Sequence, residues 1–243
     1  PIVTQPAQPR PCLSTENSQP TRAFRIGARD WETRGDTLIR RPLPTPKGVN
    51  IGFLAHLGPY SVELKQSLET FVMWFRSKRV DAVVVLGGFG PERSDVTEAL
   101  QRLAAYQVPI IALPGKEEDQ EIFEAAFADV RFYNQHFFNA QDLRFVIVSG
   151  IQLVLLPGHF NRSYTRTRHG CVYTKDDVER AITKAKERPE TPVLVTYVGP
   201  KQIGEGALDR TAEGDNSGDP FVESLLQRPG LPFGVMGNIR EAG

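Results

Sequence analysis

Hydrophobic and polar positions follow one repeating pattern through the first half of the chain. Three short apolar runs, each suited to a strand, occupy residues 49–55, 81–86 and 109–113. Each is followed by an amphipathic stretch with apolar residues every three or four positions, at residues 61–78, 94–106 and 118–128. Ser94 is the expected N-cap of the second stretch. This alternation predicts βαβ units around a mostly parallel sheet.

The pattern changes in the second half of the chain. Two apolar runs, residues 143–148 and 152–156, are joined through Ser149-Gly150, which is typical of a β-hairpin. A helix is predicted at 175–188, with Thr174 as its N-cap and Asp177 as the capping-box partner. The remaining predicted elements are two strands, at 193–196 and 232–236, and a short helix that starts at Asp219-Pro220 with Pro at its first position.

The first 46 residues differ in composition from the rest. Residues 1–22 place prolines among polar residues, which indicates an extended tether. Residues 23–31 and 37–40 predict short edge strands, with a turn at Gly35-Asp36. Prolines at 42, 44 and 46 then interrupt the chain. We therefore divide it into a Pro-rich N-terminal arm, residues 1–46, and a main domain, residues 47–243.

Charge and hydropathy argue against nucleic-acid binding, against attraction to an anionic membrane and against a transmembrane segment. Lys plus Arg and Asp plus Glu are equal at 29 each, so the neutral chain has no broad attraction to nucleic acid or to an anionic membrane. No apolar run is long enough to cross a bilayer, so we expect no transmembrane segment.

The two cysteines, Cys12 and Cys171, leave two interpretations open. They are either unrelated free thiols or one disulfide that fixes the arm to the main domain. An exported protein keeps such a bond, whereas the cytosol keeps thiols reduced. The chain starts at Pro1, and Pro-rich tethers are common behind lipid anchors. We expect an exported, periplasmic or lipid-anchored envelope protein in preference to a cytoplasmic one.

Glycine-containing turns follow four of the predicted strands. They are Ala-His-Leu-Gly at 55–58, Leu-Gly-Gly-Phe-Gly at 86–90, Leu-Pro-Gly-Lys-Glu-Glu at 113–118 and Gly-Asn-Ile-Arg-Glu at 237–241. The carboxyl ends of strands are where α/β proteins usually bind ligands. The turns therefore mark the candidate functional site.

In this order and spacing the turns resemble the calcineurin-like metallophosphoesterase family. In that family the strand ends carry Asp-x-His, Gly-Asp, Gly-Asn-His-Asp/Glu, a later single His, and Gly-His-x-His. The resemblance covers residues 49–243, and residues 83–87 followed by 109–115 are its most recognisable part. It implies an α/β fold in which a sandwich of two mixed β-sheets is flanked by helices.

Every metal-ligand position that the resemblance implies is altered in this chain: His56, Gly58, Gly88, Lys116, Glu117, Tyr197, Asn238 and Arg240. A two-metal site needs carboxylates and imidazoles, with one group bridging both ions. Gly88 has no side chain with which to bridge, and Lys116 and Arg240 bring positive charge that opposes cation binding. We therefore expect no metal, no other cofactor and no hydrolysis of phosphoesters by the two-metal mechanism.

Three interpretations of the altered site stay open. In the first, the two cations form ion pairs with Glu117, Glu118 or Glu241 and seal the site. In the second, backbone N–H groups of the turns form an anion pocket together with His56, Lys116 and Arg240. In the third, a single metal ion is held by His56, Glu117 and Glu118.

Other segments stand out without matching the site of the family. His159 follows a strand but falls on no ligand position, so we expect it to pack. Residues 162–169 carry three arginines and are expected to form a solvated loop. Residues 209–219 do not fit the spacing of a calcium-binding loop and are expected at the surface. Of the aromatic pairs 132–133 and 137–138, any exposed member would mark a partner surface.

These features predict a catalytically inactive metallophosphoesterase homologue. Such a pseudoenzyme would act as a binding, scaffold or assembly module for a protein partner. Two alternatives remain: a hydrolase with a remodelled metal site, and a non-hydrolysing sensor of a phosphate-containing ligand.

Overall fold

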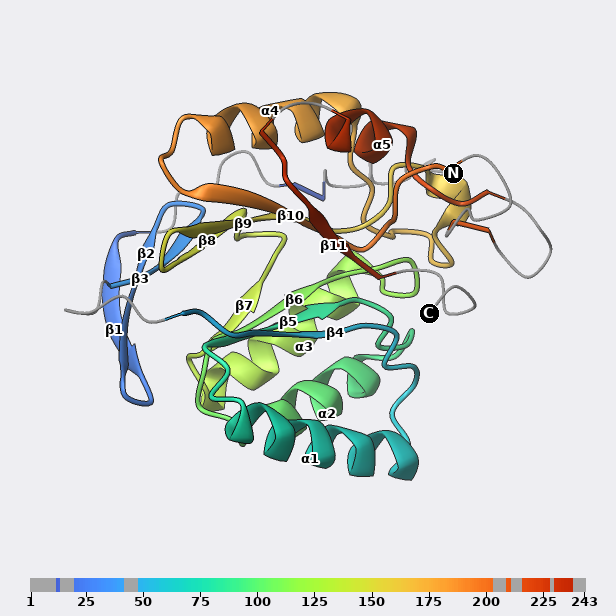
Figure 1. The fold of residues 1–243 in the computed structure, drawn as a ribbon. Coiled ribbons are helices and arrows are strands. Elements are labelled where there is room, and N and C mark those ends of the chain that lie inside the picture. The colour runs from blue at the N-terminus through green and yellow to red at the C-terminus, as the bar shows by residue number, and fades with distance from the viewer. Residues whose placement is uncertain are drawn as a thin grey trace, which may run out of the picture.

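Two β-sheets lie face to face, and helices cover the outer face of each sheet (Figure 1). The structure is a computed structural model, and it describes residues 12–13, 20–41, 48–202, 209–210, 216–227 and 230–237. The prediction of an α/β sandwich of two sheets flanked by helices is confirmed.

The smaller sheet contains the strands of the first half of the chain, and every described pair in it is parallel. Its order is β4 (Ile51–Leu54), β5 (Ala82–Leu86), β6 (Ile110–Leu113) and β7 (Phe137–Asn139). Three helices cover it: α1 (Val62–Ser77), α2 (Arg93–Leu103) and α3 (Gln120–Tyr133). We had expected both sheets to be mixed, and we did not predict β7, because its three residues are too short for a periodic pattern.

The larger sheet has seven strands, and only this sheet mixes strand directions. Its order is β1 (Arg22–Ile26), β2 (Arg29–Arg34), β3 (Thr37–Arg40), β8 (Phe145–Val148), β9 (Ile151–Leu156), β10 (Thr191–Thr196) and β11 (Gly234–Met236). The predicted hairpin is β8–β9, and both turn residues, Ser149 and Gly150, have positive φ. Two helices, α4 (Lys175–Lys186) and α5 (Pro220–Leu226), cover the outer face.

Three buried clusters hold the layers together. One lies between α1–α3 and the smaller sheet, one between the two sheets, and one between the larger sheet and α4–α5. All five residues of β5 are buried, as its uninterrupted apolar run predicts. The predicted edge strands of the arm supply Ile26, Trp31 and Leu38 to the cluster between the sheets. The division of the chain at residue 46 stays a prediction.

Helix starts follow local capping chemistry, with one correction. Thr174 caps α4 and Asp177 completes the capping box, as predicted. Helix α2, however, is capped by Glu92 and not by Ser94. The Asp95 carboxylate accepts a hydrogen bond from the Glu92 N–H at 3.2 Å and another from the Tyr60 N–H at 2.8 Å. The first bond belongs to a local capping box of Glu92 and Asp95, which places the helix start before Ser94, and the second ties this start to the turn after β4.

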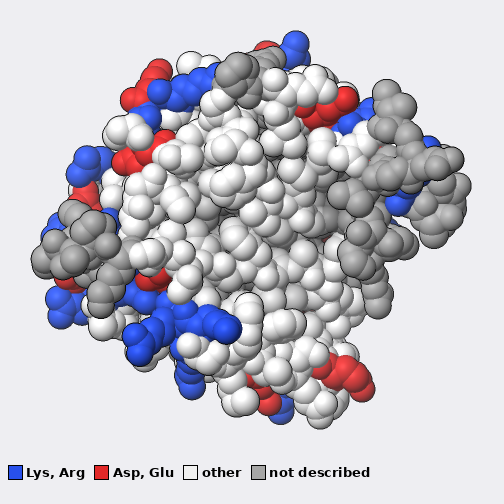
Figure 2. All heavy atoms as spheres, in the orientation of Figure 1, with Lys and Arg blue, Asp and Glu red and all other residues white. Residues whose placement is uncertain are grey.

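Charged side chains are unevenly distributed over the surface. Figure 2 shows a face whose central part is uncharged, with Lys, Arg, Asp and Glu gathered toward its margins. The elements nearest the viewer on this side are α1, β4 and β11 (Figure 1). Among the described residues, no helix is both long enough and apolar enough to cross a membrane.

Candidate functional site

The turns after the strands of both sheets meet at one edge of the sandwich. The Gly58 N–H donates to the Gly88 oxygen at 2.6 Å, which joins the turns after β4 and β5. The Gly158 N–H, after β9, donates to the Pro114 oxygen at 2.8 Å. A Cβ atom on Gly237, after β11, would lie 2.7 Å from Ala55 Cβ. Strand direction therefore brings the predicted turns together, as expected.

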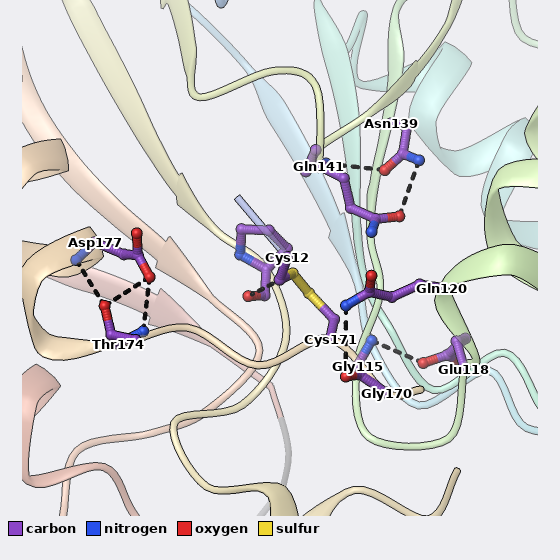
Figure 3. Close-up of a disulfide and its surroundings, with 12 residues drawn as sticks. Cys12, Gly115, Glu118, Gln120, Asn139, Gln141, Gly170, Cys171, Thr174 and Asp177 are labelled. Carbon is purple, nitrogen blue, oxygen red and sulfur yellow. Dashed lines mark hydrogen bonds between the residues drawn. A yellow bond between two sulfur atoms is a disulfide. The ribbon is translucent and has the colours of Figure 1, made fainter. Parts of the chain in front are cut away.

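Glu118 is the central polar group of this edge. Its side chain is buried, and its two carboxylate oxygens accept hydrogen bonds from the Phe89 N–H at 2.5 Å and the Gly115 N–H at 2.7 Å. The bond to Gly115 is drawn in Figure 3. Burial raises the pKa of Glu118 to about 7, although the two backbone donors oppose the rise. One carboxylate thus ties the turn after β5 to the turn after β6.

Tyr197 fills the space beside these two turns. Its ring lies so close that a Cβ atom added to Gly115 would approach Tyr197 Cε2 at 2.5 Å, and one on Gly87 would approach Cδ2 at 2.9 Å. The side chain is fully buried, and its hydroxyl has no hydrogen-bond partner among the described residues. Burial, together with the charges of Glu118 and Glu117, raises the pKa of Tyr197. A bulky neutral phenol therefore occupies the middle of the candidate site.

His56 and Gly88 face each other across the turns after β4 and β5. His56 has φ 53°, an unfavourable value for a residue with a side chain. Gly88 has φ +74°, and a Cβ atom there would lie 3.0 Å from His56 Cα. The His56 ring is 6.1 Å from that of Tyr197. Both the backbone angle and the crowding oppose any side chain at position 88.

The ion pair that Glu117 forms differs from the pairing with Lys116 that the first interpretation above proposed. Glu117 pairs with Arg166 at 3.0 Å. The described part of the chain contains no ion pair between Lys116 and Glu117 or Glu118. Two more residues of the predicted set, Asn238 and Arg240, lie outside the described residues. Whether Arg240 contributes to an anion pocket therefore stays a prediction.

The basic segment 162–169 exposes its three arginines as expected of a solvated loop, but its backbone also contacts the turn after β6. It contains a short 3-10 turn, η1 (Arg162–Tyr164), and packs across the turn after β6. The Arg166 backbone N–H donates to the backbone oxygen of Lys116 at 2.7 Å, and the Thr167 hydroxyl donates to the backbone oxygen of Glu118 at 3.3 Å. The arginines still reach solvent, but the backbone of the segment covers the candidate site.

His159 has the packing role that we expected. It is fully buried, with its ring centroid 4.8 Å from Phe160 and 4.9 Å from Tyr164. Its Nδ1 accepts a hydrogen bond from the Asn161 N–H at 3.2 Å, so this nitrogen is unprotonated. Burial, with a smaller contribution from the Lys116 charge, lowers the pKa of His159 to about 4. The imidazole is therefore neutral over the physiological range.

Two acidic residues of the segment 209–219 are buried, so a plain surface loop was the wrong description of its ends. Asn216 Nδ2 donates to both carboxylate oxygens of Asp209 at 3.0 Å. Asp219 caps α5 through the Phe221 N–H and accepts a hydrogen bond from the Tyr173 hydroxyl. Burial raises the pKa of Asp219. These contacts anchor the segment beside the carboxyl end of β10.

Cys12 and Cys171 are joined by a disulfide close to this edge (Figure 3). Both cysteines are buried in the cluster beneath α4 and α5. The Cys171 oxygen accepts a hydrogen bond from the His159 N–H at 2.9 Å. The bond thus fixes residues 12–13 against the loops that cover the candidate site.

The described donors do not fit a two-metal centre. Among these residues no group of three or more His, Cys, Asp or Glu side chains is placed to hold a metal ion. Both Glu118 oxygens are already bound to backbone N–H groups, and the Tyr197 ring takes the adjacent space. A single-metal set of His56, Glu117 and Glu118 is likewise not assembled.

Comparison with known proteins identifies the fold. No family model matches the chain, and no curated protein matches it in sequence. The crystal structure of TT1561 from Thermus thermophilus has a TM-score of 0.59 at 16% identity, over 78% of this chain and 81% of that chain. Purple acid phosphatase PPD1 from yellow lupin (Lupinus luteus) seeds has a TM-score of 0.51 at 11% identity, over 86% of this chain but 40% of the lupin chain. The chain therefore has a metallophosphoesterase-like fold, and these low identities carry no conclusion beyond the fold.

Proposed function

We propose that this chain is a catalytically inactive metallophosphoesterase homologue that serves as a protein-binding module. One observation carries the proposal: Tyr197 and Glu118 fill and cross-link the place where strand-end ligands would hold metal ions. The phenol packs against the turns after β5 and β6, and the carboxylate satisfies one backbone N–H of each turn. A site rebuilt in this way is stabilised by its own contacts and has no need of metal.

The chemistry of the neighbouring residues supports the loss of hydrolysis. A two-metal phosphoesterase needs a bridging carboxylate and an activated water between the ions. Position 88 carries no side chain, and its backbone angle and the nearby His56 Cα oppose one. Lys116, in the turn after β6, adds a positive charge that opposes cation binding. No described residue is arranged to replace these functions.

Metal analysis and a hydrolysis assay test the inactive state directly. Protein purified without chelator, then incubated with Mn²⁺, Fe²⁺ or Zn²⁺ and desalted, should retain no stoichiometric metal by elemental analysis. It should not hydrolyse aryl phosphate monoesters or diesters. Stoichiometric retention of two metal ions would refute the proposal. Metal-dependent hydrolysis that is lost in Glu117→Gln or His56→Ala would instead establish a remodelled metal site.

Thermal unfolding distinguishes the phosphate-sensor alternative from the leading proposal. Under the leading proposal, inorganic phosphate and nucleotides do not raise the unfolding temperature. A rise that disappears in Lys116→Ala or Arg240→Ala would favour the sensor.

The binding role is supported by the uncharged face in Figure 2. Helix α1 exposes Phe71 by 41% and Trp74 by 53%, and Phe233, directly before β11, is exposed by 54%. Large exposed apolar groups on an uncharged face are typical of protein interaction sites. The partner expected here is a neutral, apolar surface of another protein chain.

Photo-cross-linking tests this surface in cells that produce the protein. A photoreactive phenylalanine analogue at position 74 should give one discrete protein adduct. The same analogue at the exposed Thr183 of α4, on the opposite layer, is the matched control. Equal labelling from both positions, or none from position 74, would contradict the assignment.

The disulfide supports an exported, envelope-associated location, because such bonds persist in oxidising compartments. Alkylation of thiols in whole cells before lysis should leave both cysteines unmodified. Complete alkylation of Cys12 and Cys171 under these conditions would place the protein in a reducing compartment.

A further inference from the structure

A pocket of about 280 Å³ lies at the opposite end of the fold from the glycine turns. It is formed where the edge strands β1 and β7 of the two sheets come near the last turn of α3. Helix α3 runs back from the carboxyl end of β6 toward the amino end of β7, so its last turn is remote from the candidate site. No residue of the pocket belongs to that site.

One wall of the pocket is aromatic. The rings of Phe24 and Phe138 are stacked with centroids 5.9 Å apart, and both side chains line the pocket. Phe138 is buried and Phe24 is half-buried. A wall of this kind favours a flat or compact apolar group.

Two arginines line the same pocket. Arg131 is held in place: its Nε donates to the Phe137 oxygen at 3.0 Å, and its guanidinium carbon lies 5.6 Å from the Phe127 ring centroid. Its carboxylate partner, Asp142, is 3.9 Å away, beyond hydrogen-bonding distance. Burial lowers the pKa of Arg131, with Asp142 opposing that effect only in part. Most of the five N–H donors of this guanidinium thus have no acceptor among the described residues.

Arg22 adds a second positive charge without a matching carboxylate. Within the described part of the chain, its guanidinium donates to the neutral amide oxygen of Gln135. The amide nitrogen of Gln135 is a further donor at the rim. Two guanidinium groups therefore line the pocket, and the one carboxylate paired with them among the described residues is Asp142, 3.9 Å from Arg131, so an excess of positive charge favours an anion.

We propose that this pocket binds a carboxylate attached to an aromatic or apolar group, either as a free acid or as the carboxyl-terminal residue of a peptide. Guanidinium groups bind planar carboxylates in a two-bond geometry, and the phenylalanine wall accepts the apolar part. The size is suitable, because a cavity of about 150 Å³ is enough for benzene. This site is independent of the fate of the metal-ligand positions.

The surroundings offer additional contacts to a peptide. Phe132 and Tyr133, next to Arg131 in the chain, are exposed by 83% and 75%. They form an edge-to-face pair with centroids 5.0 Å apart at the end of α3. A peptide whose last carboxylate sits between the arginines could cover these rings, whereas a small free acid could not.

Calorimetric titration with three probes tests the proposal. The probes are 3-phenylpropionate, N-acetylphenylalanine and N-acetylphenylalanine amide, which lacks the carboxylate. At least one of the two acids should bind, and the amide should not. Binding of both acids, or of 3-phenylpropionate alone, assigns a free-acid site. Binding of N-acetylphenylalanine alone assigns a peptide carboxyl terminus.

Two variants identify the pocket. Arg22→Gln, at an exposed position, should weaken acid binding by roughly tenfold, the effect of losing one charge-assisted hydrogen bond. Arg93→Gln, an exposed arginine of α2 outside the pocket, is the matched control and should bind as the unmodified protein does. The proposal is overturned by no binding of either acid, by equal binding of the amide, or by an unchanged affinity in Arg22→Gln. Metal content and hydrolysis play no part in any of these outcomes.

Discussion

The replacement of Glu118 by glutamine provides the sharpest test of how the candidate site is held together. The Glu118 carboxylate is buried and receives the Phe89 and Gly115 N–H groups. Burial raises its pKa from the ordinary 4.5 to about 7. Glutamine keeps the shape but cannot ionise, and its amide has only one oxygen to accept hydrogen bonds.

The expected magnitude follows from this rise in pKa. Each pKa unit is equivalent to about 1.4 kcal/mol, so ionisation of Glu118 in the folded state costs about 3 kcal/mol. The folded pKa is above the unfolded value. The stability contribution is therefore complete below pH 4.5, falls as the pH rises toward about 7, and stays low above that. The glutamine variant does not lose stability in this way as the pH rises. It leaves one backbone N–H unsatisfied, which costs about 1–3 kcal/mol of folding free energy at every pH.

Urea unfolding at several pH values between 4.5 and 8, without reductant, measures both proteins. The free energy of unfolding of the Glu118→Gln variant, minus that of the unmodified protein, should rise by about 3 kcal/mol between the lowest and highest pH. Taking this difference removes the titration of other groups, including His159, which has the opposite sign. Glu121→Gln, at an exposed glutamate of the same helix, is the control and should show no such trend. Parallel pH profiles for Glu118→Gln and the unmodified protein would refute the reasoning.

Three further predictions concern the same region. Because the pKa of His159 is held near 4, below its ordinary 6.5, the stability of the unmodified protein relative to His159→Phe should fall as the pH decreases from 6.5 to 4; thermal unfolding of both proteins measures this difference, and a difference that does not change with pH would contradict the buried, neutral state of His159. Gly88→Asp should destabilise the fold by about 1–3 kcal/mol in urea, because of the positive φ and the contact with His56, without restoring metal retention; a stable, metal-retaining variant would contradict the description of the site. Cys12→Ser should cost about 2–5 kcal/mol of unfolding free energy, since the disulfide closes a sequence separation of 159 residues, and an unchanged urea midpoint would argue against the bond.

The elements that were predicted correctly depend on neighbours in the chain. The all-apolar run of β5, the turn of positive-φ residues Ser149 and Gly150, and the Thr174–Asp177 capping box each bring their own structural signal. The two errors had different origins. The start of α2 at Glu92 depends on a local capping box with Asp95 that we overlooked, whereas β7 is a strand because β6 provides its partner.

The same distinction applies to the candidate site. Alternation of strands and helices, with glycine turns after several strands, was enough to predict that His56, Gly88 and Lys116 would gather at one edge, because the carboxyl ends of parallel strands meet there, whereas Tyr197 was assigned to the site only through the family resemblance. It was not enough to pair their charges. One of the three open interpretations paired Lys116 with Glu117 or Glu118, but Glu117 pairs with Arg166 and Glu118 accepts hydrogen bonds from two backbone N–H groups.

Patterns along the chain were enough to predict an α/β layer and the positions of the turns after its strands, since periodicity and residue identity are local properties. Three features became visible in the folded protein alone: Tyr197 fills the space between two turns, the basic segment 162–169 packs on the turn after β6, and two arginines and two phenylalanines line a pocket at the far end. Burial, unsatisfied donors and shifted pKa values depend on atoms from distant parts of the chain, and no pattern along the chain specifies which of those atoms will meet.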